Sequence, residues 1–262
     1  MTQSNLISHH PQSKTFPHPL LFVHGAWHGA WCWERFFLPY FAEQGFESHA
    51  INLRGHGPGA DRKKLRWARI KDYVADVAEV ARTFTTPPIV IGHSMGGLVA
   101  QKYLETFYAP AGVLLAAVPP KGAWRTTLSY VRRHPLPFLK TNLTMNLGPI
   151  VGTPQLAREM LFSETISDDE LAAYFGQLQD ESYWAYVDMM LLNLPKPERV
   201  KVPMLVLGGE NDRVFSVEEV RETAVAYNTA PIFFSMPHNL MVEEGWRDVA
   251  NTIIDWLHQA AN

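Results

Sequence analysis

An α/β fold is the fold class that this sequence predicts, with a mostly parallel sheet of about six strands flanked by helices. Two observations predict it. Short apolar segments alternate with amphipathic segments of helical spacing from Leu20 onward, which is typical of parallel strands joined by crossover helices. The alternation stops after Val118 and resumes at Val202, so we expect an insertion within a single α/β core.

The expected strands are short and rich in Val, Ile and Leu, because helices cover both faces of a parallel sheet. They span residues 20–24, 47–53, 89–94, 112–118, 202–207 and 231–235. The expected core helices span residues 31–44, 72–84, 95–107, 217–227 and 246–258. In such a sheet the chemistry takes place at the carboxyl ends of the strands, so residues that directly follow a strand are the candidates for a functional site.

The segment 119–197 has repeated prolines and several helical patterns but no strand pattern, and it is too long for a plain loop. We interpret it as a helical cap, or lid, inserted between the two parts of the core, residues 18–118 and 198–262. Residues 1–17 are polar and lack the apolar stretch of a secretory signal, so we expect a flexible N-terminal tail.

Within the expected cap, the clearest helix begins at Asp168. Ser167 has the side chain of an N-cap, and Glu170 stands at the partner position of a capping box. Asp188 fits the solvated face of another helix. His134 is a candidate contact for a substrate rather than a catalytic base, because it does not follow a strand.

The composition is that of a globular protein, with 47% hydrophobic and 19% charged residues and a formal net charge of −3. It indicates neither a nucleic-acid-binding surface nor a polybasic anchor, and no apolar run approaches the ~20 residues of a membrane helix. The single cysteine, Cys32, permits no intramolecular disulfide and fits a structural role in a reducing compartment. We therefore expect a cytoplasmic monomer or homodimer that acts on a small neutral or apolar molecule.

The run Gly92-His93-Ser94-Met95-Gly96 places a serine between two glycines, directly after a buried strand and before a helix. A turn this tight strains the serine backbone, and glycines two positions before and after the serine leave room for the turn. The helix N-terminus also offers free backbone N–H groups to a developing negative charge. Ser94 is therefore the candidate nucleophile.

A serine hydroxyl is a weak nucleophile, so Ser94 needs a histidine base and an acid that orients the histidine. His238 follows the last expected strand and is the candidate base. Asp212 follows the strand 202–207 in a turn-rich segment and is the candidate acid. Glu210 is the rival acid, and we expect it to face solvent or to pair with an arginine.

Attack on an ester also requires N–H donors for the oxyanion of the transition state. The N–H of Met95 is one candidate, because this residue follows the nucleophile. The N–H of Ala26 is the second, because the glycine-rich loop after the first strand is expected beside Ser94. His24 and His28 have the spacing of a metal pair on a helix, but the glycines beside them disfavour a helix and no third ligand follows. We expect neither a metal nor a cofactor.

Together, His24-Gly25, the run Gly92–Gly97, Asp212 and His238 resemble the α/β-hydrolase family. The resemblance covers the chain apart from the expected tail. It implies that the nucleophile, acid and histidine named above form a catalytic triad and that the two N–H groups form its oxyanion hole. It also implies the α/β-hydrolase fold, with the helical insertion as its cap.

The loop His24–Trp31 is similar to that of small plant esterases and hydroxynitrile lyases. The lyases carry a lysine directly after the catalytic histidine, whereas Asn239 stands at that position here, which disfavours cyanohydrin cleavage. Dehalogenases of this fold use an aspartate nucleophile, so Ser94 argues against that activity. The run Arg54–Gly57 looks like the family's loop after the second strand, where we expect His56 to pack within the loop. The cap sequence looks closer to bacterial hydrolases described as lipases or lysophospholipases.

We expect a serine carboxylic-ester hydrolase that forms an acyl-enzyme and acts on a small to medium hydrophobic ester. Alternatives within the same fold are a cofactor-free perhydrolase or haloperoxidase, a thioesterase, a lactonase, a C–C bond hydrolase, and a ligand receptor with slow turnover. The expected substrate contacts are large side chains of the first loop and of the cap. They are Trp27, His28, Trp124, Phe162 and Trp184.

Overall fold

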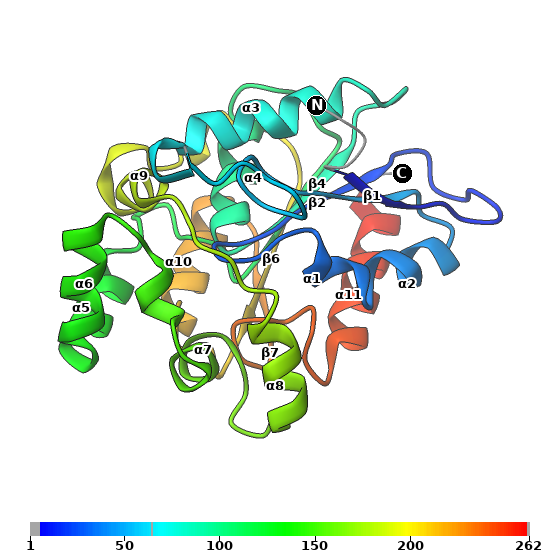
Figure 1. Ribbon diagram of the computed structural model, residues 1–262. Helices are drawn as coiled ribbons and strands as arrows, with labels where there is room; N and C mark the ends of the chain where they lie inside the picture. Colours follow the sequence, from blue (N-terminus) through cyan, green and yellow to red (C-terminus); the bar gives the residue numbers. More distant parts are fainter. Residues whose placement is uncertain (1–5, 64, 261–262) are drawn as a thin grey trace.

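The computed structural model describes residues 6–63 and 65–260, and the strands within them form one seven-stranded sheet (Figure 1). The strand order is β1-β3-β2-β4-β5-β6-β7, and every neighbouring pair is parallel except β1 with β3. The strands are β1 (Leu6–His9), β2 (Leu20–Val23), β3 (Ser48–Ile51), β4 (Ile89–His93), β5 (Gly112–Leu115), β6 (Met204–Gly209) and β7 (Pro231–Phe234). The predicted α/β fold with a mostly parallel sheet is confirmed.

Helices cover both faces of the sheet. One face packs against α1 (Trp31–Glu34), α2 (Phe37–Glu43) and α11 (Trp246–Ala260), and the other against α3 (Ile70–Ala81), α4 (Met95–Leu104) and α10 (Val217–Ala226). Successive side chains of a strand point to opposite faces. In β2, Leu20 and Phe22 therefore join the core on the α2 side. Leu21 and Val23 join the core on the α3 side.

The helix predicted over residues 31–44 is divided in two. Phe36 leaves the helical conformation, with φ −129° and ψ −54°, and separates α1 from α2. Its ring stacks on Trp246 of α11, with the ring centroids 4.9 Å apart. The aromatic contact with a helix from the other end of the chain stabilises this break.

The predicted flexible tail, residues 1–17, contains strand β1. Residues 6–9 pair antiparallel with residues 48–51 of β3. Without β1, β3 would be the edge of the sheet and would expose a row of unpaired backbone groups. The prediction of a flexible tail is therefore wrong for residues 6–9, and residues 1–5 lie outside the described residues.

Between β5 and β6 the chain forms a helical segment without strands, every residue of which is described. Its α-helices are α5 (Trp124–Arg133), α6 (Pro135–Thr144), α7 (Pro154–Leu161), α8 (Asp168–Phe175) and α9 (Tyr183–Val187). Ser167 caps α8 as predicted, because its Oγ accepts a hydrogen bond from the N–H of Glu170 at 3.2 Å. The Glu170 carboxylate binds the same hydroxyl at 2.9 Å, so it does not complete the expected capping box.

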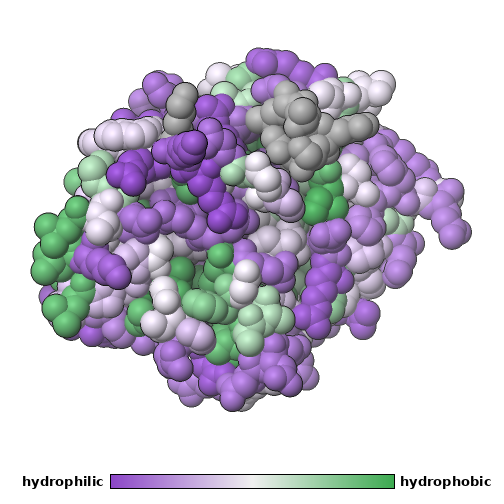
Figure 2. Space-filling view, in the orientation of Figure 1, coloured by the Kyte–Doolittle hydropathy of each residue, from purple (hydrophilic) through white to green (hydrophobic). Residues whose placement is uncertain are grey.

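The outer surface of this helical segment carries an apolar patch over α5 and α6, which Figure 2 shows at the left edge of the molecule. The exposed leucines of these two helices are Leu128, Leu136, Leu139 and Leu143. None of the helices in the described residues combines the length and the hydropathy that crossing a membrane would require.

Candidate active site

Ser94 stands in the tight turn between β4 and α4, with φ 53° and ψ −118°. A side chain at Gly92 would place its Cβ 2.3 Å from the carbonyl oxygen of Gly96. A side chain at Gly96 would place its Cβ 2.3 Å from the carbonyl oxygen of Val23. Glycine is therefore required at both positions, because a side chain would collide with backbone atoms that cannot move aside. The strained turn is held by β5, because the Ser94 N–H donates to the carbonyl of Leu115 at 3.0 Å.

Asp212 and His238 lie against each other at the carboxyl ends of β6 and β7. Asp212 Oδ2 is 2.8 Å from His238 Nδ1, and both side chains are buried. The other carboxylate oxygen of Asp212 accepts the N–H groups of Val214 at 2.6 Å and Phe215 at 3.1 Å. A carboxylate fixed in this way holds the proton of the imidazole on Nδ1. His238 Nε2 binds no other group of the described residues and is left to accept a proton.

The loop that carries His238 is positioned by close backbone contact with the end of β6. A Cβ at Gly209 would lie 2.3 Å from the carbonyl oxygen of Met236, so a glycine is needed there. The carbonyl of His238 also accepts a hydrogen bond from His93 Nε2 at 3.0 Å. His93 precedes Ser94, so the loop of His238 and the serine are tied to the same turn.

The rival acids and bases lie elsewhere. Glu210 is exposed, as expected. His134 pairs with both carboxylate oxygens of Glu159 at 3.0 Å and does not line the cavity beside Ser94. Asp188 is not on a solvated face: it is fully buried and binds the guanidinium of Arg69.

The loop after β2 passes directly beside the serine. A Cβ at Gly25 would lie 2.9 Å from His93 Nδ1 and 3.0 Å from Ser94 Cβ, so only a glycine allows this approach. The N–H groups of Ala26 and Met95 have no hydrogen-bond partner among residues 6–63 and 65–260. Ala26 and Met95 are buried residues, and their N–H groups without partners, one in this loop and one at the start of α4, fit the requirements of an oxyanion hole.

Three buried histidines surround the serine turn in uncharged form. Burial lowers the pKa of His24 and His93 well below the usual value, and it lowers the pKa of His28 to about 4. His28 Nδ1 donates to the carbonyl of Ala26 at 2.7 Å, and Asn239 Nδ2 donates to His28 Nε2 at 3.2 Å. Both nitrogens of His28 are thus used to hold the loop, and Asn239 completes that contact.

His56 is buried in its loop, and it also forms an ion pair that the sequence did not suggest. Its Nε2 lies 3.2 Å from Oε2 of Glu181, and neither side chain is exposed. Burial disfavours the protonated ring, but the adjacent carboxylate outweighs burial and raises the pKa of His56. No signal in the sequence around His56 points to a partner in the distant helical segment.

A cavity with about 580 Å³ of empty space, including the part that opens to solvent, adjoins Ser94. Its wall combines the loop after β2, the loop after Asp212 and the helical segment. The lining residues are Ala26, Trp27, Ser94, Val118, Ala123, Thr126, Thr127, Tyr130, Phe138, Leu147, Ile150, Met160, Tyr186, Met189, Val214 and Phe215. Of the five predicted substrate contacts, this lining includes only Trp27.

The other four residues that we expected to contact the substrate lie outside the cavity lining. His28 holds the loop as described above, and Trp124 is 43% exposed. Phe162 stacks on Tyr174 with the ring centroids 5.5 Å apart, and Trp184 lies beneath the guanidinium of Arg69. The sequence pointed to large aromatic side chains, but the rings of Phe162 and Trp184 pack against Tyr174 and Arg69 instead of lining the cavity. The sequence reasoning missed Val214 and Phe215, although they directly follow the candidate acid.

Apart from Ser94, the polar side chains of the cavity wall form hydrogen bonds within the protein. The Thr126 hydroxyl donates to the carbonyl of Val214 at 2.5 Å, and the hydroxyls of Thr127 and Tyr186 lie 2.9 Å apart. Tyr130 donates to the carbonyl of Ile150 at 2.9 Å. The lining contains no charged side chain. The cavity therefore offers an apolar surface beside the serine.

A model of the alpha/beta hydrolase family matches residues 20–252 of the chain. Methylesterase 10 of Arabidopsis thaliana is 29% identical over 123 residues, which cover 45% of this chain and 43% of that protein. The probable esterase PIR7A of Oryza sativa subsp. indica is 30% identical over 168 residues, which cover 57% of this chain and 61% of that protein. The chain thus matches less than two thirds of the length of these relatives.

The fold also matches that of solved structures. MenH from S. aureus superimposes with a TM-score of 0.74 over 100% of both chains, at 17% sequence identity. Identity this low shows a shared fold and nothing about activity. The family match covers most of the chain, and it agrees with the sheet order and the serine turn described above. This chain belongs to the alpha/beta hydrolase family.

Proposed function

We propose that this protein is a serine hydrolase that cleaves carboxylic esters of small to medium apolar molecules. The observation that carries the proposal is the buried hydrogen bond between Asp212 and His238, formed at the same sheet edge as the strained Ser94. An orienting acid, a base and a serine in a strained turn beside a cavity are the three parts that nucleophilic catalysis by serine needs. The similarity to esterases over part of the chain supports the same activity.

In the proposed reaction, His238 Nε2 takes the proton of the Ser94 hydroxyl while Oγ attacks the ester carbonyl. Asp212 holds the proton on Nδ1 and stabilises the imidazolium. The carbonyl oxygen becomes an oxyanion, which the N–H groups of Ala26 and Met95 bind. The alkoxide leaves with the proton from Nε2, and a water molecule then repeats the sequence on the acyl-enzyme and releases the acid.

The cavity supports an apolar substrate. The wall has no charged side chain, and its hydroxyls other than that of Ser94 already have partners. It would therefore leave a polar acyl group desolvated. The helical segment between β5 and β6 supplies much of this wall, including Tyr130, Phe138 and Met160. We propose that residues 119–197 act as a cap that closes over the substrate, which is the role predicted for them from the sequence.

The test is the substitution Ser94→Ala in the purified protein, assayed with p-nitrophenyl acetate and butyrate. We expect turnover to fall on the order of 10⁴-fold, and we expect a fluorophosphonate probe to label Ser94 in the unsubstituted protein. Ser13→Ala changes an exposed serine outside the site and is the control. Ester turnover near the unsubstituted rate in Ser94→Ala would refute the proposal. Labelling of Ser94 without continued turnover would indicate a ligand receptor instead.

A further inference from the structure

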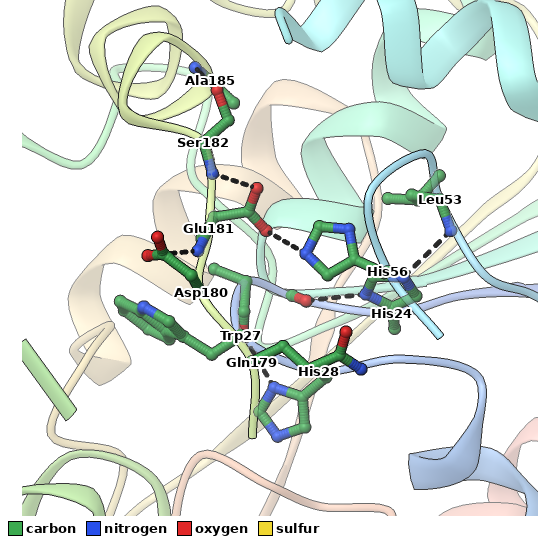
Figure 3. A network of polar contacts seen from close by, with 12 residues as sticks. His24, Trp27, His28, Leu53, His56, Gln179, Asp180, Glu181, Ser182 and Ala185 are labelled. Carbon is green, nitrogen blue, oxygen red and sulfur yellow. Dashed lines mark hydrogen bonds and ion pairs between the residues drawn. The ribbon is translucent and has the colours of Figure 1, made fainter. Parts of the chain in front are cut away.

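Residues 179–182 connect α8 and α9 of the helical segment, and they lie against the loop after β2 that contains Ala26. In Figure 3 this segment runs past His56 at Glu181 and past Trp27 at Gln179. Several of its hydrogen bonds are with residues more than a hundred positions earlier in the chain. The segment is thus a direct link between the helical insertion and the loop that contains Ala26.

The first contact fixes the carbonyl of Trp27, the residue after Ala26. The backbone N–H of Gln179 donates to the carbonyl oxygen of Trp27 at 2.8 Å. Trp27 has a φ of 64°, a left-handed conformation that a tryptophan adopts only when its surroundings impose it. The side chain of Gln179 also accepts the N–H of Gly57 at 3.2 Å, so this residue is itself tied to the core.

The second contact is made by a carboxylate that is fully enclosed. Glu181 Oε1 accepts the hydroxyl of Tyr73 at 2.6 Å and the N–H of Ser182 at 2.6 Å. Its other oxygen is 3.2 Å from His56 Nε2. A buried carboxylate is costly unless it is hydrogen-bonded or paired with a charge. Here Oε1 is hydrogen-bonded and Oε2 lies at ion-pair distance from His56 without hydrogen-bond geometry, so this arrangement favours one position for the segment.

The ion pair of Glu181 and His56 is connected through His24 to Gly25, the residue before Ala26. The rings of His56 and His24 lie 4.9 Å apart. His24 Nδ1 donates to the carbonyl of Gly25 at 2.8 Å, and its Nε2 accepts the N–H of Leu53 at 3.2 Å. Residues 25 and 27 are therefore both held by contacts that lead back to the 179–182 segment. Ala26 lies between them.

We propose that Glu181 is a positioning residue that, through His56 and the 179–182 segment, holds the Ala26 N–H where it binds the oxyanion. The inference rests on the proposed function, because it concerns the same transition state. Glu181 does not line the cavity, so it acts on the reaction only through the loop. Displacing an oxyanion donor weakens binding of the transition state more than binding of the neutral ester.

The test compares Glu181→Gln with Asp188→Asn. Asp188 is the matched control, because it is also a buried carboxylate of the insertion and it binds Arg69 and the N–H of Ile70, but it does not contact the loop of Ala26. In Glu181→Gln we expect kcat for p-nitrophenyl butyrate to fall about tenfold to hundredfold, with KM changed less than threefold. The inhibition constant of phenylboronic acid, which forms a tetrahedral adduct with the serine, should rise by a similar factor. Asp188→Asn should keep kcat within about threefold.

Tyr73→Phe is the second variant, because it removes one hydrogen bond to Glu181 and leaves the carboxylate in place. Tyr73→Phe should lower kcat by a smaller factor than Glu181→Gln does. It keeps the inference testable if Glu181→Gln does not fold. An unchanged kcat in both variants, or an equal loss in Asp188→Asn, would overturn the positioning role while leaving ester hydrolysis intact. An unsubstituted protein that neither hydrolyses the esters nor reacts at Ser94 would overturn the proposed function and this inference together.

Discussion

The buried histidines make the stability of this protein dependent on pH above the range in which carboxylates titrate. His28 has a pKa of about 4 in the folded protein, against 6.5 for a free imidazole. A lowered folded pKa contributes stability that is present above pH 6.5 and is lost as the pH falls toward 4, because the unfolded chain binds the proton first. His24 and His93 shift in the same direction through burial.

The magnitude follows from the two pKa values of His28. Each pKa unit corresponds to about 1.4 kcal/mol, so lowering the pH from 7 to 5 removes about 2 kcal/mol of folding free energy through this residue alone. His24 and His93 add to the loss. His56 does not, because its folded pKa is raised, and its contribution is fully present below pH 6.5 and declines only as the pH rises through the folded pKa.

The measurement is urea unfolding at pH 7, 6 and 5, followed by tryptophan fluorescence. We expect the free energy of unfolding to fall by more than 2 kcal/mol between pH 7 and 5 in the unsubstituted protein. His28→Gln removes one titrating group, so its loss over the same range should be smaller by about 2 kcal/mol. His10→Gln, at an exposed position, is the control. Equal pH dependence in the unsubstituted protein and in His28→Gln would refute the reasoning.

Two further predictions concern the reaction. In Asp212→Asn, the amide oxygen would keep the N–H groups of Val214 and Phe215, so the amide NH₂ would face His238 Nδ1 and force the imidazole proton onto Nε2. We expect kcat/KM for p-nitrophenyl butyrate to fall about 10⁴-fold at pH 7, and a loss below tenfold would contradict the role of the acid. In Phe138→Ala, the cavity gains space, so the ratio of kcat/KM for long to short acyl chains should rise about tenfold or more in a C2–C12 series. An unchanged chain-length ranking would show that Phe138 does not limit the acyl site.

The serine turn and its neighbours could be predicted because their signals are local. The glycines around Ser94 and the apolar strand before it occur within ten residues. Asp212 and His238 could be placed together for a second reason: the carboxyl ends of parallel strands share one edge of the sheet. The hydrogen bond between them follows from that topology.

The cavity wall and strand β1 could not be predicted in the same way. β1 has four residues, and it is stable only because β3, about forty positions later, offers an unpaired edge. The cavity wall was sought among large aromatic residues, yet Trp124 is exposed and Phe162 packs in the core. Which ring faces a cavity depends on how the helices of the insertion pack, and periodicity does not determine this.

The same limit explains why two carboxylates of the insertion were misjudged or passed over. Asp188 was expected on a solvated face, and Glu181 was given no role, yet both are buried. Their partners Arg69 and Tyr73 lie 119 and 108 residues earlier in the chain, at the start of α3. A buried carboxylate destabilises a protein unless such partners are in place, so these two contacts fix where the insertion sits on the core. Of the two carboxylates, only Glu181 also leads through His56 to the loop of Ala26, so the geometry beside the serine depends on a contact that no local sequence pattern records.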